Sequence, residues 1–136
     1  MDRRTALTTS LGALALLSVR DAQAQTLPPG AEEKTVGKGV RVITYGESPS
    51  IIPGIKTVRF RDVILEPGAT NGPSPMMPMI CHMAQGELEV TRTGTNLDEK
   101  FLAKQYHVWT CSTGMTEGVE NKGNVVAIMR IIDIIT

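Results

Sequence analysis

The side chains best suited to chemistry form a sulfur-rich group near the middle of the chain. Four of its seven methionines, Met76, Met77, Met79 and Met83, fall in one short segment, and Cys81 lies among them. Thioethers and thiolates are soft ligands, and they select soft cations such as Cu(I). A second interpretation is that these methionines fill gaps in a core, as Met often does. The sequence leaves both interpretations open.

Strand periodicity predicts which of these side chains share a face. Successive residues of a strand point to opposite sides of a sheet. Met79, Cys81 and Met83 would therefore lie on one face, and Ile80 and His82 on the other. The same rule predicts a common face for the next chemically active group, formed by His107, Trp109 and Cys111.

The elements that hold these residues are predicted to be short strands. Gly (13) and Pro (8) are numerous and β-branched residues come in short runs, a pattern typical of strands joined by turns. A length of 136 residues predicts one domain. The charge is balanced, with 14 basic and 14 acidic residues, and gives no indication of a nucleic-acid partner. The predicted strands include 40–45, 56–65, 87–93, 107–111 and 125–135.

Two stretches resemble the paired motifs of the cupin family. The first opens with Pro67-Gly68-Ala69 and closes with Gln85-Gly86-Glu87-Leu88-Glu89-Val90. The second matches at Gly114, in the spacing to Glu117, and at Asn121-Lys122-Gly123-Asn124 before an apolar strand. The resemblance covers about residues 55–135. It implies an all-β fold, an antiparallel double-stranded β-helix barrel of the jelly-roll type with six to eight strands.

The resemblance does not extend to the family's metal ligands. Counting back from Gly86 places the family's glutamate at Met79 and its two histidines at Pro73 and Pro75. The histidine of the second motif falls on Glu117. Because proline offers no side-chain ligand, we expect no iron, manganese or zinc centre of the family type. The dioxygenase and isomerase activities that depend on that metal are not expected either.

The jelly-roll topology implied by the resemblance makes the strands of Cys81 and Cys111 neighbours. Neighbouring strands permit a disulfide in an oxidising compartment. A disulfide would remove the thiolates of a soft-metal site, for which Met79, Cys81 and Cys111 are the candidate ligands, so the two hypotheses exclude each other. The candidate ligand-binding residues of the barrel interior are Met77, Met79, Cys81, Met83, Trp109 and Glu117.

Glu117 is the candidate catalytic residue. A carboxyl group at the mouth of an apolar barrel has its neutral form favoured by desolvation and can act as a general acid or base. The alternative is a carboxylate solvated at the rim, since most carboxylates are exposed. His82 and His107 have no partner at a fixed spacing and are expected to be structural or surface residues. Asn121 is interpreted as a turn residue.

The first 24 residues predict a secretory signal peptide. Arg3-Arg4 precede an apolar stretch at 7–19, and Ala22-Gln23-Ala24 is a small-residue cleavage site. The paired arginines fit a twin-arginine export signal as well as an ordinary one. Residues 25–54 would then form an N-terminal extension with one strand, and 55–136 the barrel. We expect a periplasmic or secreted protein with no membrane anchor after cleavage.

The leading functional hypothesis is an exported cupin-like protein that binds an unidentified small molecule in its barrel. One alternative is a metal-free acid–base enzyme of the isomerase or lyase type that uses Glu117. Another is periplasmic copper binding through Met and Cys, with Cu(I) as the ion. The sequence favours a binding protein over an enzyme. The sequence leaves two assemblies open: a homodimer with the apolar strand at 125–135 as its interface, or a barrel that buries this strand within itself.

Overall fold

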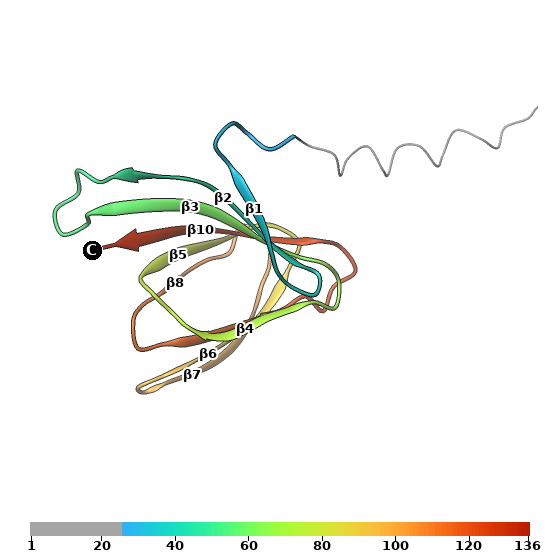
Figure 1. Cartoon of the computed structure of the whole chain (residues 1–136). Helices are drawn as coiled ribbons and strands as arrows, with labels where there is room; N and C mark the ends of the chain where they lie inside the picture. The colour runs from blue at the N-terminus through green and yellow to red at the C-terminus, as the bar shows by residue number, and fades with distance from the viewer. Residues whose placement is uncertain (1–25) are drawn as a thin grey trace, which may run out of the picture.

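The chain folds into ten strands that form two facing sheets in the computed structural model, which describes residues 26–136 (Figure 1). The predicted signal peptide lies outside these residues. Within the described part, no helix is long and apolar enough to cross a bilayer. The strands are β1 (Glu32–Gly37), β2 (Val40–Pro49), β3 (Thr57–Leu65), β4 (Thr70–Pro75), β5 (Met79–Gln85), β6 (Leu88–Gly94), β7 (Leu97–Ala103), β8 (Val108–Cys111), β9 (Thr116–Glu120) and β10 (Ala127–Ile135).

The two sheets have the connectivity of an antiparallel jelly roll. The larger has the order β1-β2-β3-β10-β5-β8, and the smaller has the order β4-β9-β6-β7. All pairings are antiparallel. The all-β jelly-roll prediction is therefore confirmed. Eight of the ten strands, β3 to β10, lie within the predicted barrel, in agreement with the six to eight expected. One of them, β4, carries two prolines on an exposed sheet edge, where proline is tolerated.

The predicted N-terminal extension contributes two strands rather than one. β1 pairs with β2, and β2 runs along β3 from Val40, opposite Leu65, to Pro49, opposite Thr57. A register shift between Thr44 and Gly46 lets β2 continue to Pro49, beyond the predicted strand at 40–45. The predicted extension thus contributes residues 32–49 to the large sheet.

The inner face of the large sheet carries the predicted sulfur residues. In β5, Met79, Cys81 and Met83 are buried, and Ile80 and His82 point the other way. The face assignment made from strand periodicity is confirmed. In β10 the inward residues alternate in the same way and end at Asp133, which is also buried.

Two of the motif residues hold the turns that bring β5 and β9 into place. Gly86 lies between β5 and β6 with φ 70°, and a Cβ there would stand 2.9 Å from the carbonyl oxygen of Val126. Asn121 follows β9 and is fully buried. Its amide donates to the carbonyls of Leu65 and Val125 at 3.0 and 2.8 Å, and its Oδ1 accepts from a backbone N–H. Asn121 is therefore a turn residue, as predicted.

Candidate functional site

Glu117 lies inside the barrel and not at its rim. In β9 the buried positions alternate, so Glu117 faces the large sheet and is only 5% exposed. Its Oε2 accepts hydrogen bonds from Trp109 Nε1 at 3.1 Å and from Cys111 Sγ at 2.9 Å. The alternative of a carboxylate solvated at the rim is therefore wrong, because two inward donors from β8 bind this carboxylate in the interior.

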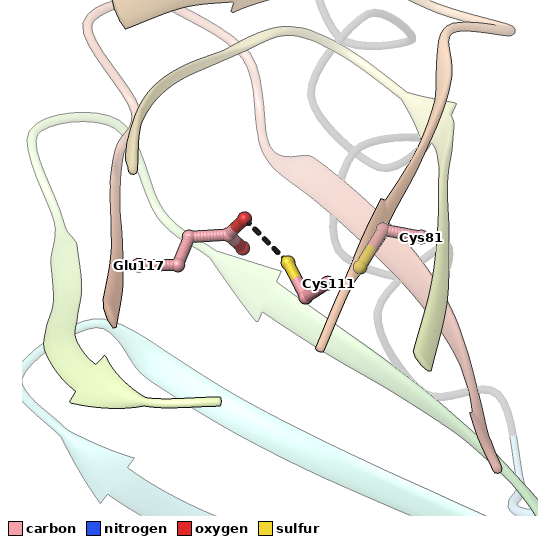
Figure 2. Close-up of side chains that lie close together, drawn as sticks. All are labelled: Cys81, Cys111 and Glu117. Atoms are coloured by element: carbon pink, nitrogen blue, oxygen red, sulfur yellow. Dashed lines mark hydrogen bonds between the residues drawn. The ribbon is translucent and has the colours of Figure 1, made fainter. Parts of the chain in front are cut away.

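Cys81 and Cys111 join Glu117 in a buried cluster, which we call the Cys-Cys-Glu cluster. One ligand atom from each of the three residues lies within 4.8 Å of the others. Figure 2 shows Cys111 between the other two residues, with its thiol donating a hydrogen bond to Glu117. The cluster combines two soft thiols with one carboxylate, away from solvent.

Both cysteines are free thiols. β5 and β8 are neighbours, as expected, but Cys81 stands opposite Trp109, and Cys111 stands opposite Met79. The two cysteines are therefore diagonal neighbours. Diagonal residues have Cα atoms about 7–8 Å apart, whereas a bridge needs less than about 7 Å. A disulfide would require the two backbones to move, so it stays a prediction that this register disfavours.

The environment of the thiols keeps Cys81 protonated. The hydrogen bond with Cys111 raises the pKa of Cys81 far above its ordinary value, and burial and the nearby Glu117 carboxylate act in the same direction. Arg61 acts weakly the other way. An ion that displaces these protons would turn the cluster from neutral thiols into thiolates, the form that binds metal.

A small cavity of about 70 Å³ reaches Glu117 from the edge of the barrel. Its lining includes Met76, Met79, Met129, Arg61, Ser74 and Glu117. Ligand pockets usually measure about 300–1,000 Å³, so the cavity suits an ion or a few waters rather than a metabolite. The barrel interior expected for a small molecule is therefore too small in this conformation.

The other predicted ligand-binding residues separate into two groups. Met83 and Trp109 are buried in the core. Met77 is half exposed and does not line the cavity, so its assignment to the interior was wrong. Met76 lines the cavity instead of Met77. The pairing of β4 with β9 shifts between Asn71 and Ser74, and periodicity cannot predict such a shift.

The same shift changes which β4 residue stands beside Glu117. Ser74 is opposite Glu117 and lines the cavity, whereas Pro73 packs against Gly118 and faces a groove on the outer side of the small sheet. The histidine positions counted onto Pro73 and Pro75 therefore do not frame the interior. Neither His82 nor His107 belongs to the Cys-Cys-Glu cluster: His82 faces outward, and His107 is exposed and stacks on Phe101.

Two charged groups near the site were not identified from the sequence. Asp133 is buried and accepts three hydrogen bonds, two from Arg61 and one from Arg59. Burial would raise the pKa of Asp133, but these arginines hold it below the ordinary value. The available signal was a lone carboxylate in a strand that is apolar apart from Arg130. Arg92 stands opposite Glu117, but its guanidinium bonds Glu99 and the Thr110 carbonyl.

Solved structures with the same architecture come from the cupin fold. KdgF from Halomonas sp. has 15% identity and a TM-score of 0.59, over 75% of this chain and 84% of that one. The Schizosaccharomyces pombe Cnp3 cupin domain has 16% identity and a TM-score of 0.58, over 79% and 71%. An RmlC-like cupin from Shewanella frigidimarina NCIMB 400 has 9% identity and a TM-score of 0.58, over 84% and 92%.

No family model and no curated protein sequence matches the chain. At these low identities the structural likeness defines the fold and nothing finer. The chain is a cupin-fold protein with a buried Cys-Cys-Glu cluster.

Proposed function

We propose that this protein binds a cuprous ion inside its barrel. The ligands are the sulfurs of Cys81 and Cys111, with the thioether of Met79 beside them. The observation that supports this function is the Cys-Cys-Glu cluster, whose ligand atoms lie within 4.8 Å of one another in the buried interior. Met79 is the direct cross-strand partner of Cys111 on the same face. Thiolates and thioethers are the ligands that Cu(I) prefers.

Binding exchanges protons for the ion. Each thiol loses one proton when it becomes a ligand. Glu117 already accepts the hydrogen bond of Cys111, so its carboxylate is placed to take that proton and pass it toward the cavity. Arg61 acts to lower the pKa of Cys81, but the hydrogen bond with Cys111, burial and Glu117 outweigh it, so the ion itself must displace the proton.

The donor set fits Cu(I) better than Zn(II). Structural zinc sites use four ligands drawn from cysteine thiolates and histidines, and catalytic sites use three that include histidine. Here both histidines lie outside the cluster, and the remaining sulfur neighbour, Met79, is a thioether. Thioethers are common ligands of soft cations and not of zinc.

The acid–base alternative has less support from the geometry. A sugar or keto compound would have to reach Glu117 through a cavity of about 70 Å³. Both donors to Glu117 are neutral side chains of the protein, and both bind the same carboxylate oxygen, Oε2. Turnover of such a compound would first require the barrel to open.

Small-molecule binding is a second candidate, at a different place from the one expected. A groove of about 420 Å³ lies on the outer face of the small sheet, between residues such as Thr91, Thr116, Glu120 and Pro73. This size falls within the range of ligand pockets. A thermal-shift screen with metabolites would test it: a ligand whose effect is lost in Thr91→Trp but kept in Cys111→Ser supports the groove. If no metabolite shifts the unfolding temperature, this second function is rejected.

The copper proposal is tested by anaerobic competition between the protein and a chromophoric Cu(I) chelator. We expect one tightly bound Cu(I) per chain, lost in the variant Cys81→Ser/Cys111→Ser and kept in Met83→Leu. Met83 is a matched control because it is buried on the same strand but does not line the cavity. Retention of zinc in place of copper would overturn the choice of ion. Undiminished binding by the double cysteine variant would overturn the site.

Export to the periplasm and assembly as a homodimer are also proposals. Export predicts a mature protein that begins after Ala24, which N-terminal sequencing of protein from the periplasm would test. A homodimer predicts twice the monomer mass in light scattering. A free-thiol count in denaturant should give two thiols per chain, and a count of zero would restore the disulfide.

A further inference from the structure

The Cys-Cys-Glu cluster is buried, so an ion needs a route to it. The cavity beside Glu117 is lined at one end by exposed residues of β4, Gly72 and Ser74, and at the other by buried residues that include Met79 and Met129. β4 is an edge strand of the small sheet. The lining therefore runs from solvent at the sheet edge to the carboxylate of the cluster.

Thioethers line this passage from its half-buried part to its inner end. Met76 is half-buried and packs against the core, Met79 is buried next to Cys111 in the sheet register, and Met129 is buried in β10. All three face the same cavity as Glu117. Met77, in the loop between β4 and β5, and Met83, on β5, do not line it.

We propose that Met76 and Met129, together with Met79, form a thioether entry site that captures a cuprous ion and delivers it to the two thiols. This inference rests on the proposed copper function and adds to it a second, transient position for the ion. A thioether is a neutral soft ligand, so it binds Cu(I) without first losing a proton. Capture can therefore precede the slower exchange of protons at the buried cysteines.

The charges along the passage suit a monovalent cation on its way inward. Arg61 lines the cavity, and Asp133, which also binds Arg59, holds its guanidinium through two hydrogen bonds, at 2.7 and 2.9 Å, so part of the positive charge is compensated. Glu117 lies at the inner end, where it accepts hydrogen bonds from two neutral donors, Trp109 and Cys111. The methionines carry the ion between these two points without charge of their own.

The test measures how fast and how tightly Cu(I) is taken from a chromophoric chelator by the full chain under anaerobic conditions. The variant is Met76→Leu/Met129→Leu, and Met83→Leu is the control. Met-to-Leu changes nearly conserve volume, so the barrel should keep its packing; near-UV circular dichroism checks this. We expect loading about tenfold slower in the double variant, with equilibrium affinity unchanged, and loading at the wild-type rate in the control.

The outcomes separate this inference from the function on which it rests. Equal loading rates in Met76→Leu/Met129→Leu and wild type, with binding still lost in Cys81→Ser/Cys111→Ser, would overturn the entry site alone. A double methionine variant that loses equilibrium affinity would make these residues permanent ligands and would also overturn it. If the cysteine variant binds Cu(I) as tightly as wild type, the proposed function itself fails.

Discussion

Glu117 and Asp133 are two buried carboxylates on facing sheets, and they differ in what surrounds them. Glu117 is 5% exposed and Asp133 is 2% exposed. Asp133 accepts three charged hydrogen bonds from Arg59 and Arg61 at 2.7–2.9 Å. Glu117 accepts two, from an indole and a thiol, and forms no ion pair with the residues of the described chain.

The difference indicates that burial alone does not mark a functional carboxylate. The two arginines compensate the charge of Asp133, so removing it would leave two cations without their partner. The partners of Glu117 are neutral, and one of them is a thiol that can become a metal ligand. Asp133 is therefore expected to govern stability, and Glu117 to govern binding.

The largest effect is expected when the thiol next to Glu117 is removed. Cys111→Ser keeps a hydroxyl that can donate to Glu117, so the interior hydrogen bond can be retained. The variant loses a soft ligand, and its affinity for Cu(I) should fall by at least about 100-fold, since even loss of an outer partner costs about 10–100-fold. Chelator competition measures this, and an affinity close to wild type would refute the assignment of Cys111.

Asp133→Asn should lower the free energy of unfolding by about 3 kcal/mol, near the lower end for a broken buried ion pair, because Arg59 and Arg61 keep some contact with water. Chemical denaturation measures this. Its matched partner is Glu117→Gln, which should change stability by less than about 1.5 kcal/mol, the scale of one neutral hydrogen bond. Equal destabilisation by both variants would remove the distinction between the two carboxylates.

Glu117→Gln should weaken Cu(I) binding about tenfold, as expected for a residue that acts through a ligand and not as one. The amide cannot take the proton of Cys111. Asp133→Asn, measured by the same chelator competition, should have a smaller effect on affinity. The reverse order would mean that the ion is held near the arginines and not at the cysteines.

The pH dependence of stability should identify Asp133 as well. Arg61 and Arg59 outweigh burial and keep the pKa of Asp133 below its ordinary value. A carboxyl group whose pKa is lower in the folded state stabilises the protein at pH values above its unfolded-state pKa of about 3.9. This stabilisation is lost as the pH falls through the folded-state pKa. The difference in free energy of unfolding between wild type and Asp133→Asn should therefore have its full size at pH 6 and become smaller below about pH 4. Thermal unfolding across this pH range measures the difference, and a difference that does not change with pH would contradict this prediction.

Much of the fold was predictable because it depends on local patterns. Strand periodicity placed Met79, Cys81 and Met83 on one face, and the Pro-Gly and Gly turns marked the motif frame. Both are properties of a few adjacent residues, so a sequence carries them directly.

The parts that could not be predicted depend on how strands align with one another. The register of β5 against β8 places Cys81 opposite Trp109 and makes the two cysteines diagonal. The shift in the pairing of β4 with β9 brings Met76 inward and leaves Met77 outside. The buried ion pairs of Asp133 could not be predicted for the same reason, because the arginines that bind it lie on β3, which is distant in sequence.

The most direct test is a crystal structure of the protein loaded with Cu(I), with anomalous scattering recorded at the copper edge. We predict one strong anomalous peak within bonding distance of the sulfurs of Cys81 and Cys111, and none at the carboxylate of Asp133. A loaded protein whose peak lies elsewhere, or crystals in which the two thiols remain without an ion, would contradict the account.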